Sequence, residues 1–236
     1  MEINDKYKLL IASTSTVHGS GYLEYIMDDA VRFLGVEEII FIPYARPSGV
    51  TFDEYTEAPR KAFEARGIKV KGLHEFQNPQ EAILTAKAIF TGGGNTFLLL
   101  KSLYELDLID VLRVAINSGT PYMGSSAGSN ITGLTIGTTN DMPIVYPPSF
   151  EALGFLPFNL NPHYLDPDPN SKHKGETRET RIKEFHKFNS QAVLGLREGS
   201  WLEVQNGKIE LKGDLTARLF QQEKEAVELN TGVINI

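Results

Sequence analysis

A serine set among small residues is the most reactive feature of this sequence. Residues 121–128 read PYMGSSAG, so residues 124–128 match the pattern G-x-S-x-G, with Ser126 at its centre. This pattern is typical of a sharp strand-to-helix turn that presents a serine hydroxyl. The amide of the next residue, Ala127, would face a developing oxyanion. We therefore expect Ser126 to be a nucleophile, the alternative being an ordinary turn rich in small residues.

A run of three glycines could supply the second oxyanion donor. Residues 91–96 read TGGGNT, after an apolar segment and before a helix-like one. Such a backbone can approach a ligand closely and aim its N–H groups at an anion. We expect Gly93 or Gly94 to be the donor. A phosphate-binding loop uses the same physics, but the run fits neither the P-loop nor the dinucleotide-binding pattern.

A serine nucleophile needs a base, most often histidine. Among the five histidines, His163 has the most suitable setting, because it follows the apolar run Gly154–Leu160 and a proline that stiffens the chain. A histidine with a purely structural role is the alternative. His186 lies in a helix-like segment, where a structural role is expected.

The third member of a triad is a carboxylate that holds the imidazole. Glu198 follows the strand-like segment 191–197, and Asp141 lies in the segment TTNDM. Either could be a plain surface carboxylate. The order of Ser126, His163 and Glu198 differs from the Ser–acid–His order of α/β-hydrolases, which Asp141 would restore. Position in the sequence leaves both carboxylates open.

The segments that would position these residues alternate between strand-like and helix-like patterns. Five short segments are strand-like, and the apolar runs among them are what a parallel sheet covered on both faces requires: Lys8–Ser13, Glu38–Tyr44, Ile68–Leu73, Ala88–Thr91 and Pro121–Gly124. The predicted helices are Tyr22–Leu34, Thr51–Arg66, Gln80–Lys87, Thr96–Asn117 and one that begins near Ala127. We predict an α/β fold, a doubly wound and mostly parallel sheet, with ligands at the carboxyl ends of the strands.

The last third of the chain changes character. Strand-like segments here are Gln191–Leu196, Ser200–Leu211, Thr216–Phe220 and Ala226–Leu229. Asn206-Gly207 is typical of a hairpin turn. These segments predict an antiparallel C-terminal edge. Because no linker or repeat divides the chain, we expect residues 1–236 to form a single domain.

Composition narrows the class of protein. The chain has no cysteine, so disulfides and thiolate metal sites are excluded, and a reducing, cytoplasmic setting is expected. The net charge of −7 argues against nucleic acid as a partner. No apolar run is long enough to span a membrane, and no signal peptide is visible. Neither a cofactor nor a metal is expected, since no metal-ligand spacing such as H-E-x-x-H occurs.

Taken together, the motifs resemble the S51 serine peptidases, the family of peptidase E or α-aspartyl dipeptidase. The resemblance covers most of the chain, and its most specific blocks are residues 41–43, 52–56 (FDEYT), 92–97 (GGGNTF), 124–130 (GSSAGSN), 138–145 (TTNDMPIV), 161–163 (NPH), 173–178 (HKGETR) and 198–201. It implies a class I glutamine amidotransferase-like (flavodoxin-like) fold with serine in place of the cysteine. It also implies catalytic roles for Ser126, His163 and Glu198, with Gly94 and Ala127 as oxyanion donors.

The resemblance further implies a small peptide substrate with an N-terminal aspartate. Such a substrate requires a cation, and Arg178 and Arg181 are the candidates because an arginine fork matches a carboxylate. Alternatively, these arginines belong to a solvated helix face. Asp141 or Glu176 could bind the substrate amino group. Asn95 is a further candidate for substrate binding.

Two other functions stay open on sequence grounds. A cyanophycinase-like isopeptidase would use the same nucleophile on β-linked aspartyl peptides. A non-catalytic anion-binding module would use the glycine run without a reacting serine. A homodimer is compatible with the sequence, which does not indicate the oligomeric state.

Overall fold

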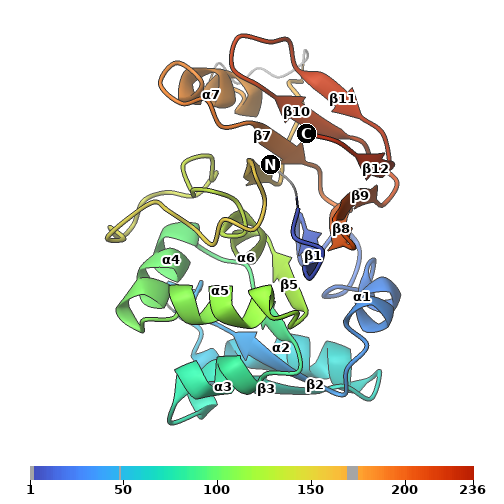
Figure 1. The fold of residues 1–236 in the computed structure, drawn as a ribbon, viewed down its shortest axis with the longest axis vertical. Coiled ribbons are helices and arrows are strands. Elements are labelled where there is room, and N and C mark those ends of the chain that lie inside the picture. The colour runs from blue at the N-terminus through green and yellow to red at the C-terminus, as the bar shows by residue number, and fades with distance from the viewer. Residues whose placement is uncertain (1–2, 48, 169–174) are drawn as a thin grey trace.

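A computed structural model describes residues 3–47, 49–168 and 175–236. Its main sheet has eight strands in the order β12-β9-β8-β1-β5-β4-β2-β3 (Figure 1). Five of them run parallel and form the centre and one side: β1 (Lys8–Ala12), β2 (Glu38–Ile42), β3 (Lys69–Gly72), β4 (Ile89–Thr91) and β5 (Tyr122–Ser125). The predicted doubly wound, mostly parallel α/β sheet is confirmed.

The apolar strands are buried on both faces because alternate side chains enter two different cores. Leu9 and Ile11 of β1 join one apolar cluster, whereas Leu10 and Ala12 join the other. This is the period-two alternation of a strand. It explains why β1, β2, β4 and β5 are buried at consecutive positions, as strands covered on both faces require, whereas the edge strand β3 (KVKG) alternates between exposed and buried residues.

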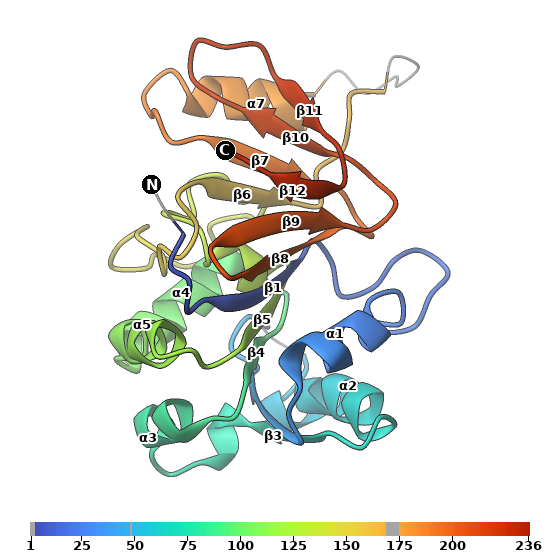
Figure 2. The same ribbon diagram turned by 45° about the vertical axis from the view of Figure 1, so that its right-hand side comes forward.

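Helices cover both faces of this sheet (Figure 2). On one face lie α1 (Met27–Leu34) and α2 (Phe52–Glu64), and on the other lie α3 (Pro79–Thr85), α4 (Thr96–Glu105) and α5 (Ile109–Asn117). A short 3₁₀ helix, η1 (Leu73–Glu75), follows β3.

Two of the predicted helices differ from those in the structure. The expected single helix over 96–117 is divided into α4 and α5, because Asp107 adopts a left-handed conformation with φ of +54°. Such a residue ends a helix. The expected helix over 22–34 begins only at Met27, and turns precede it.

The strands of the C-terminal third are divided between two sheets, although the sequence predicts a single antiparallel edge. β8 (Trp201–Gln205), β9 (Lys208–Lys212) and β12 (Gly232–Ile234) extend the main sheet beyond β1, and each of them is antiparallel to its neighbours. A second sheet, in the order β11-β10-β7-β6, holds β6 (Asn159–Pro162), β7 (Val193–Leu196), β10 (Ala217–Phe220) and β11 (Val227–Leu229), with α7 (Arg178–Phe185) packed on it. The predicted antiparallel pairing is therefore present for β8 and β9 and for β7, β10 and β11, but the last three strands lie in the second sheet, where β7 also pairs parallel to β6.

The predicted hairpin turn between β8 and β9 is confirmed. Asn206 and Gly207 have φ values of +52° and +68°. Positive φ at both central residues is what a tight hairpin turn of this kind requires, and Asn-Gly tolerates it best.

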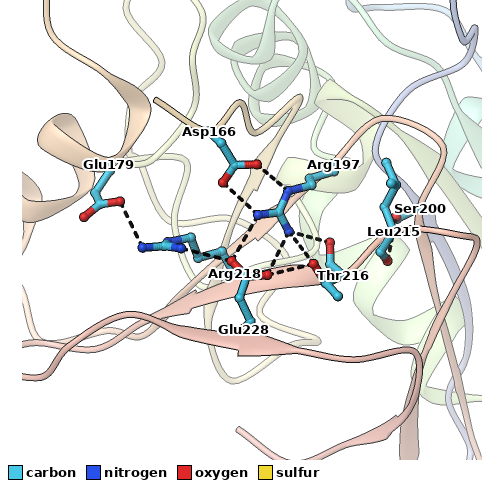
Figure 3. A network of polar contacts seen from close by, with 8 residues as sticks. All are labelled: Asp166, Glu179, Arg197, Ser200, Leu215, Thr216, Arg218 and Glu228. Carbon is cyan, nitrogen blue, oxygen red and sulfur yellow. Dashed lines mark hydrogen bonds and ion pairs between the residues drawn. The ribbon is translucent and has the colours of Figure 1, made fainter. Parts of the chain in front are cut away.

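A network of ion pairs holds the end of β7 to its neighbours (Figure 3). Arg197 donates two hydrogen bonds of 2.7 and 2.8 Å to Asp166, which follows β6, and two of 3.0 Å to Glu228 of β11. Arg218 of β10 reaches both Glu228, at 3.0 Å, and Glu179 of α7, at 3.2 Å. The Arg197 guanidinium also lies 5.6 Å from the centre of the Tyr164 ring. Strands distant in the sequence are thus joined beside His163 and Glu198.

Glu228 makes the stability of this sheet depend on pH. Its hydrogen bonds from Arg197 lower the pKa of its carboxyl from 4.5 to about 2. A carboxyl whose pKa falls on folding stabilises the fold above its unfolded pKa, and that stabilisation is lost as the pH falls through the folded pKa. We predict that Glu228→Gln lowers the free energy of unfolding at pH 7, and that its difference from the parent chain vanishes between about pH 4.5 and pH 2.

Urea unfolding over this pH range tests the prediction. Glu37→Gln is the matched control, since Glu37 is exposed and its carboxylate has no ion pair with another described residue. A Glu228→Gln variant as stable as the parent at pH 7, or one whose deficit persists at pH 2, would contradict the account of this network.

Candidate active site

Ser126 lies on a strained turn at the carboxyl end of β5. Its φ and ψ are +52° and −110°, and α6 (Ala127–Asn130) begins at the next residue. The glycines on either side of Ser126 are required because a side chain there would collide with neighbouring backbone. A Cβ on Gly124 would lie 2.4 Å from the Gly128 carbonyl oxygen, and one on Gly128 would lie 2.1 Å from that of Thr91. The predicted strand-to-helix turn is present, and the strain is of the kind that collects at functional sites.

The glycine run lies directly against this turn. A Cβ built on Gly93 would be 3.0 Å from the Cβ of Ser126. Gly94 has a φ of +143°, and a Cβ there would lie 2.2 Å from the carbonyl oxygen of Ala45. The next amide, that of Asn95, donates to the same oxygen at 2.7 Å. The two motifs found in the sequence therefore form one small surface, since β4 and β5 are neighbours in the sheet.

His163 reaches Ser126 from the second sheet. It follows β6, and its Nε2 lies 2.8 Å from Ser126 Oγ. Its φ of +54° is unusual for a residue with a side chain. Ser13, which follows β1, holds it in place by accepting its N–H at 2.9 Å while donating to the Leu196 carbonyl at 2.7 Å. One serine hydroxyl thus joins the main sheet, His163 and β7.

Glu198 is hydrogen-bonded to the other side of the imidazole, at 2.6 Å from its Nδ1. The pair is adjacent because β6 and β7 run parallel with Pro162 opposite Leu196, so the residues beyond both strands meet. The side chains of His163 and Glu198 are 35% and 43% exposed. With an ionised carboxylate at Nδ1, that nitrogen carries the proton and Nε2 is free to accept from the serine hydroxyl.

Asp141 lies beside the nucleophile but has other partners. Its Oδ2 accepts hydrogen bonds from the backbone N–H and the hydroxyl of Thr96, at 2.7 and 2.6 Å. It lines a small hollow that also contains Ser126 and His163. Both polar atoms of the Asn95 side-chain amide have partners within the protein. The oxygen caps α4, and the nitrogen donates to the Met142 carbonyl at 2.8 Å.

The two candidate arginines lie in the first turn of α7 and have different surroundings. Arg178 is partly buried and makes no ion pair with another described residue. Burial lowers the pKa of its guanidinium, the nearby charge of Arg181 adds to that effect, and Asp141 opposes it. Arg181 pairs with Glu176 at 3.7 Å, and both of these side chains are about half exposed. Of the sequence block 173–178, His173 and Lys174 lie outside the described residues.

Other expected groups have roles away from this site. His186, at the end of α7, is hydrogen-bonded to the Gln191 carbonyl at 3.0 Å, as expected of a structural histidine. In the described part of the chain, no group of three or more His, Cys, Asp or Glu side chains is arranged to bind a metal. No helix among those residues is both long and apolar enough to cross a membrane. The role of Ser13 was not predicted, since a lone serine after a strand carries no recognisable signal.

This chain is similar to known proteins over most of its length. The model of "Peptidase family S51" matches residues 9–212. The chain is 48% identical over 225 residues to the "Probable alpha-aspartyl dipeptidase" of Drosophila melanogaster, covering 94% of this chain and 92% of that protein. It is 50% identical to the "Peptidase E" of Streptomyces coelicolor, covering 95% and 91%. A crystal structure of a peptidase from an acI-B1 Actinobacterium has the same fold, with a TM-score of 0.69 at 16% identity over 98% of this chain and 96% of that one. This chain belongs to peptidase family S51.

Proposed function

We propose that this protein is a serine dipeptidase that cleaves short peptides with an N-terminal aspartate through an acyl-enzyme. The observation that carries the proposal is the hydrogen-bonded chain from Ser126 Oγ to His163 Nε2, at 2.8 Å, and from His163 Nδ1 to Glu198, at 2.6 Å. A nucleophile within reach of a base that is itself oriented by a carboxylate is the arrangement that acyl transfer requires. The names of the relatives support the substrate class.

The chemistry follows from these contacts. His163 Nε2 takes the proton of Ser126 as its oxygen attacks the peptide carbonyl, and the amides of Gly94 and Ala127 stabilise the oxyanion. Glu198 holds the imidazolium, which then gives its proton to the leaving amine as the peptide bond breaks. Water attacks the resulting ester by the same route and releases the aspartyl product. The leaving group and both protons are thereby accounted for.

We assign Glu198 rather than Asp141 to the triad. The support for this choice is that Glu198 contacts the imidazole, whereas one carboxylate oxygen of Asp141, Oδ2, already accepts two hydrogen bonds from Thr96. An acidic group beside the nucleophile suits the positively charged amino group of the substrate, so we propose that role for Asp141. Glu176 is less suited because it pairs with Arg181. The role of Asn95 in substrate binding stays a prediction.

Arg178 is the proposed partner of the substrate aspartate side chain. It is a partly buried cation without an ion pair among the described residues, and it lies near enough to Asp141 for their charges to interact. When the substrate binds, this guanidinium would pair with the aspartate carboxylate through two parallel hydrogen bonds. The pair of Asp141 and Arg178 would then recognise both charges of an aspartyl residue, which restricts the enzyme to N-terminal aspartate.

Three expectations from the sequence stay predictions. A cytoplasmic location rests on the absence of cysteine. A homodimer and a single domain over residues 1–236 rest on no further observation, although one apolar cluster does include residues from both sheets.

The substrate assignment predicts cleavage of α-Asp-Leu, but not of its β-linked isomer or of Ala-Leu, and loss of that cleavage in Ser126→Ala. Amine release measured by liquid chromatography tests it, with Ser125→Ala as the control for a neighbouring serine. Cleavage of the β-linked peptide alone would favour an isopeptidase of the cyanophycinase type. No cleavage of any of the three would contradict the dipeptidase assignment and favour an anion-binding module.

The assignment of the third triad member predicts different kinetic defects in two variants. Glu198→Gln should lower kcat roughly 10²-fold or more, because the imidazolium loses its counter-charge. Asp141→Asn should act mainly by raising KM, because it removes a charge from the substrate site. Steady-state kinetics with α-Asp-Leu separate the two effects. The reverse pattern, with kcat lost in Asp141→Asn and kept in Glu198→Gln, would overturn the assignment.

Arg178→Met should lower kcat/KM for α-Asp-Leu by roughly 10- to 100-fold, the range expected when a charge-assisted hydrogen bond is lost. Cleavage of Ala-Leu should change little, so the preference for aspartate would fall by the same factor. Arg181→Met is the matched control and should have a smaller effect, because Arg181 is already paired with Glu176. Equal preference in Arg178→Met and the parent chain would exclude this role.

A further inference from the structure

The sequence block 52–56 (FDEYT) has no part in the chemistry described so far. It opens α2, and one of its residues, Tyr55, reaches the glycine run from the face of the sheet that α1 and α2 cover. The side chain of Tyr55 is only 5% exposed, and its ring packs edge-on against Phe41 with centroids 5.2 Å apart. Its hydroxyl donates a buried hydrogen bond of 2.7 Å to the carbonyl oxygen of Gly93. Tyr55 is thus bonded to the glycine run beside Ser126.

The geometry of the peptide bond transmits this contact to the next amide. A trans peptide unit is planar, so the C=O of Gly93 and the N–H of Gly94 point in opposite directions. A hydrogen bond that fixes the carbonyl therefore also fixes the direction of the N–H. Gly93 itself lies against the nucleophile, since a Cβ on it would be 3.0 Å from that of Ser126.

The glycine run needs such an anchor. Three consecutive glycines have far more backbone freedom than other residues, and a peptide between two of them can rotate at little cost. Beyond the run, the Asn95 amide is held by the Ala45 carbonyl at 2.7 Å, but that bond is made by the next peptide and not by the Gly93–Gly94 peptide. A rotated peptide would turn a carbonyl dipole, instead of an N–H, toward the negative charge that develops on the substrate.

The Tyr55 hydroxyl is protonated and able to donate at neutral pH. Burial raises the pKa of Tyr55 above its ordinary value, although the Arg46 guanidinium, 4.7 Å from the ring centre, acts in the opposite direction. The Tyr55 hydroxyl also packs closely against the backbone of the glycine run. A Cβ on Gly92 would lie 2.3 Å from the Tyr55 oxygen, so glycine is required there for the hydroxyl to reach its acceptor.

We propose that Tyr55 is a positioning residue that orients the Gly93–Gly94 peptide and so aims the Gly94 N–H at the oxyanion formed at Ser126. The inference rests on the proposed function, because it takes Gly94 as an oxyanion donor. Tyr55 itself touches neither the substrate nor the nucleophile. Its contribution is made in the transition state, where the oxyanion forms, and not in substrate binding.

Tyr55→Phe tests this role, since it keeps the ring and removes only the hydroxyl. We expect kcat for α-Asp-Leu to fall roughly tenfold or more, somewhat less than when an oxyanion donor is deleted outright, with KM nearly unchanged. Tyr104→Phe is the matched control. It also removes a hydrogen bond from a tyrosine hydroxyl to a backbone carbonyl, here an exposed one of 2.9 Å to Glu151, and should keep the kcat of the parent chain.

A second readout does not depend on the substrate. A fluorophosphonate reacts with an activated serine and places its phosphoryl oxygen where the oxyanion would lie, so its rate of reaction at Ser126 should fall in Tyr55→Phe by a similar factor. Thermal unfolding shows whether the variant is folded. Incorporation of p-aminophenylalanine in place of Tyr55 restores a donor at the same position and should recover much of both rates.

The outcomes separate this inference from the proposed function. A folded Tyr55→Phe variant with the kcat and labelling rate of the parent overturns the role of Tyr55 while leaving the dipeptidase intact. Loss of stability and a rise in KM, without a change in labelling rate, would also overturn it. If the parent cleaves no aspartyl peptide but Ser126 is labelled, and more slowly in Tyr55→Phe, the substrate assignment fails and the role of Tyr55 stands.

Discussion

The two hydrogen bonds of the His163 imidazole are the interaction on which the rest of the site depends, because the bond to Ser126 joins the two sheets and the bond to Glu198 orients the imidazole. Ser126 follows strand β5 of the main sheet, whereas His163 and Glu198 follow two paired strands of the second sheet. Distances of 2.8 and 2.6 Å leave only a few tenths of an ångström of tolerance before such bonds weaken. The relative position of the sheets must therefore be held closely.

Apolar packing and polar contacts share this task. One apolar cluster includes side chains from both sheets and brings them together, but such packing is not directional. Hydrogen bonds are directional, and the Ser13 hydroxyl makes two of them here, accepting from the His163 N–H and donating to the Leu196 carbonyl. The ion pairs of Arg197 hold the next residue, Glu198, at the end of β7. On the other side of the nucleophile, Tyr55 holds the glycine run in a comparable way.

Features of the site that depend on neighbouring residues in the chain could be predicted from the sequence, and those that depend on distant ones could not. The turn at Ser126 and the Asn206-Gly207 hairpin follow from local backbone requirements. The strand β6, which reads NLNP, has no strand-like pattern, and its asparagines are buried because they bond to nearby loops. Without β6 the second sheet could not be foreseen. Choosing Glu198 over Asp141 from the residues alone would have required the register of β6 with β7, which brings His163 and Glu198 together. In the sequence, only the family resemblance favours Glu198.

Mapping a covalent adduct tests the central claim most directly. The chain would be treated with a fluorophosphonate, and the modified residue identified by mass spectrometry of its peptides. The account predicts one adduct, on Ser126 and not on the adjacent Ser125, that fails to form in His163→Ala. An unmodified protein, an adduct on another serine, or labelling that persists without His163 would contradict the claim that Ser126 is a nucleophile activated by this histidine.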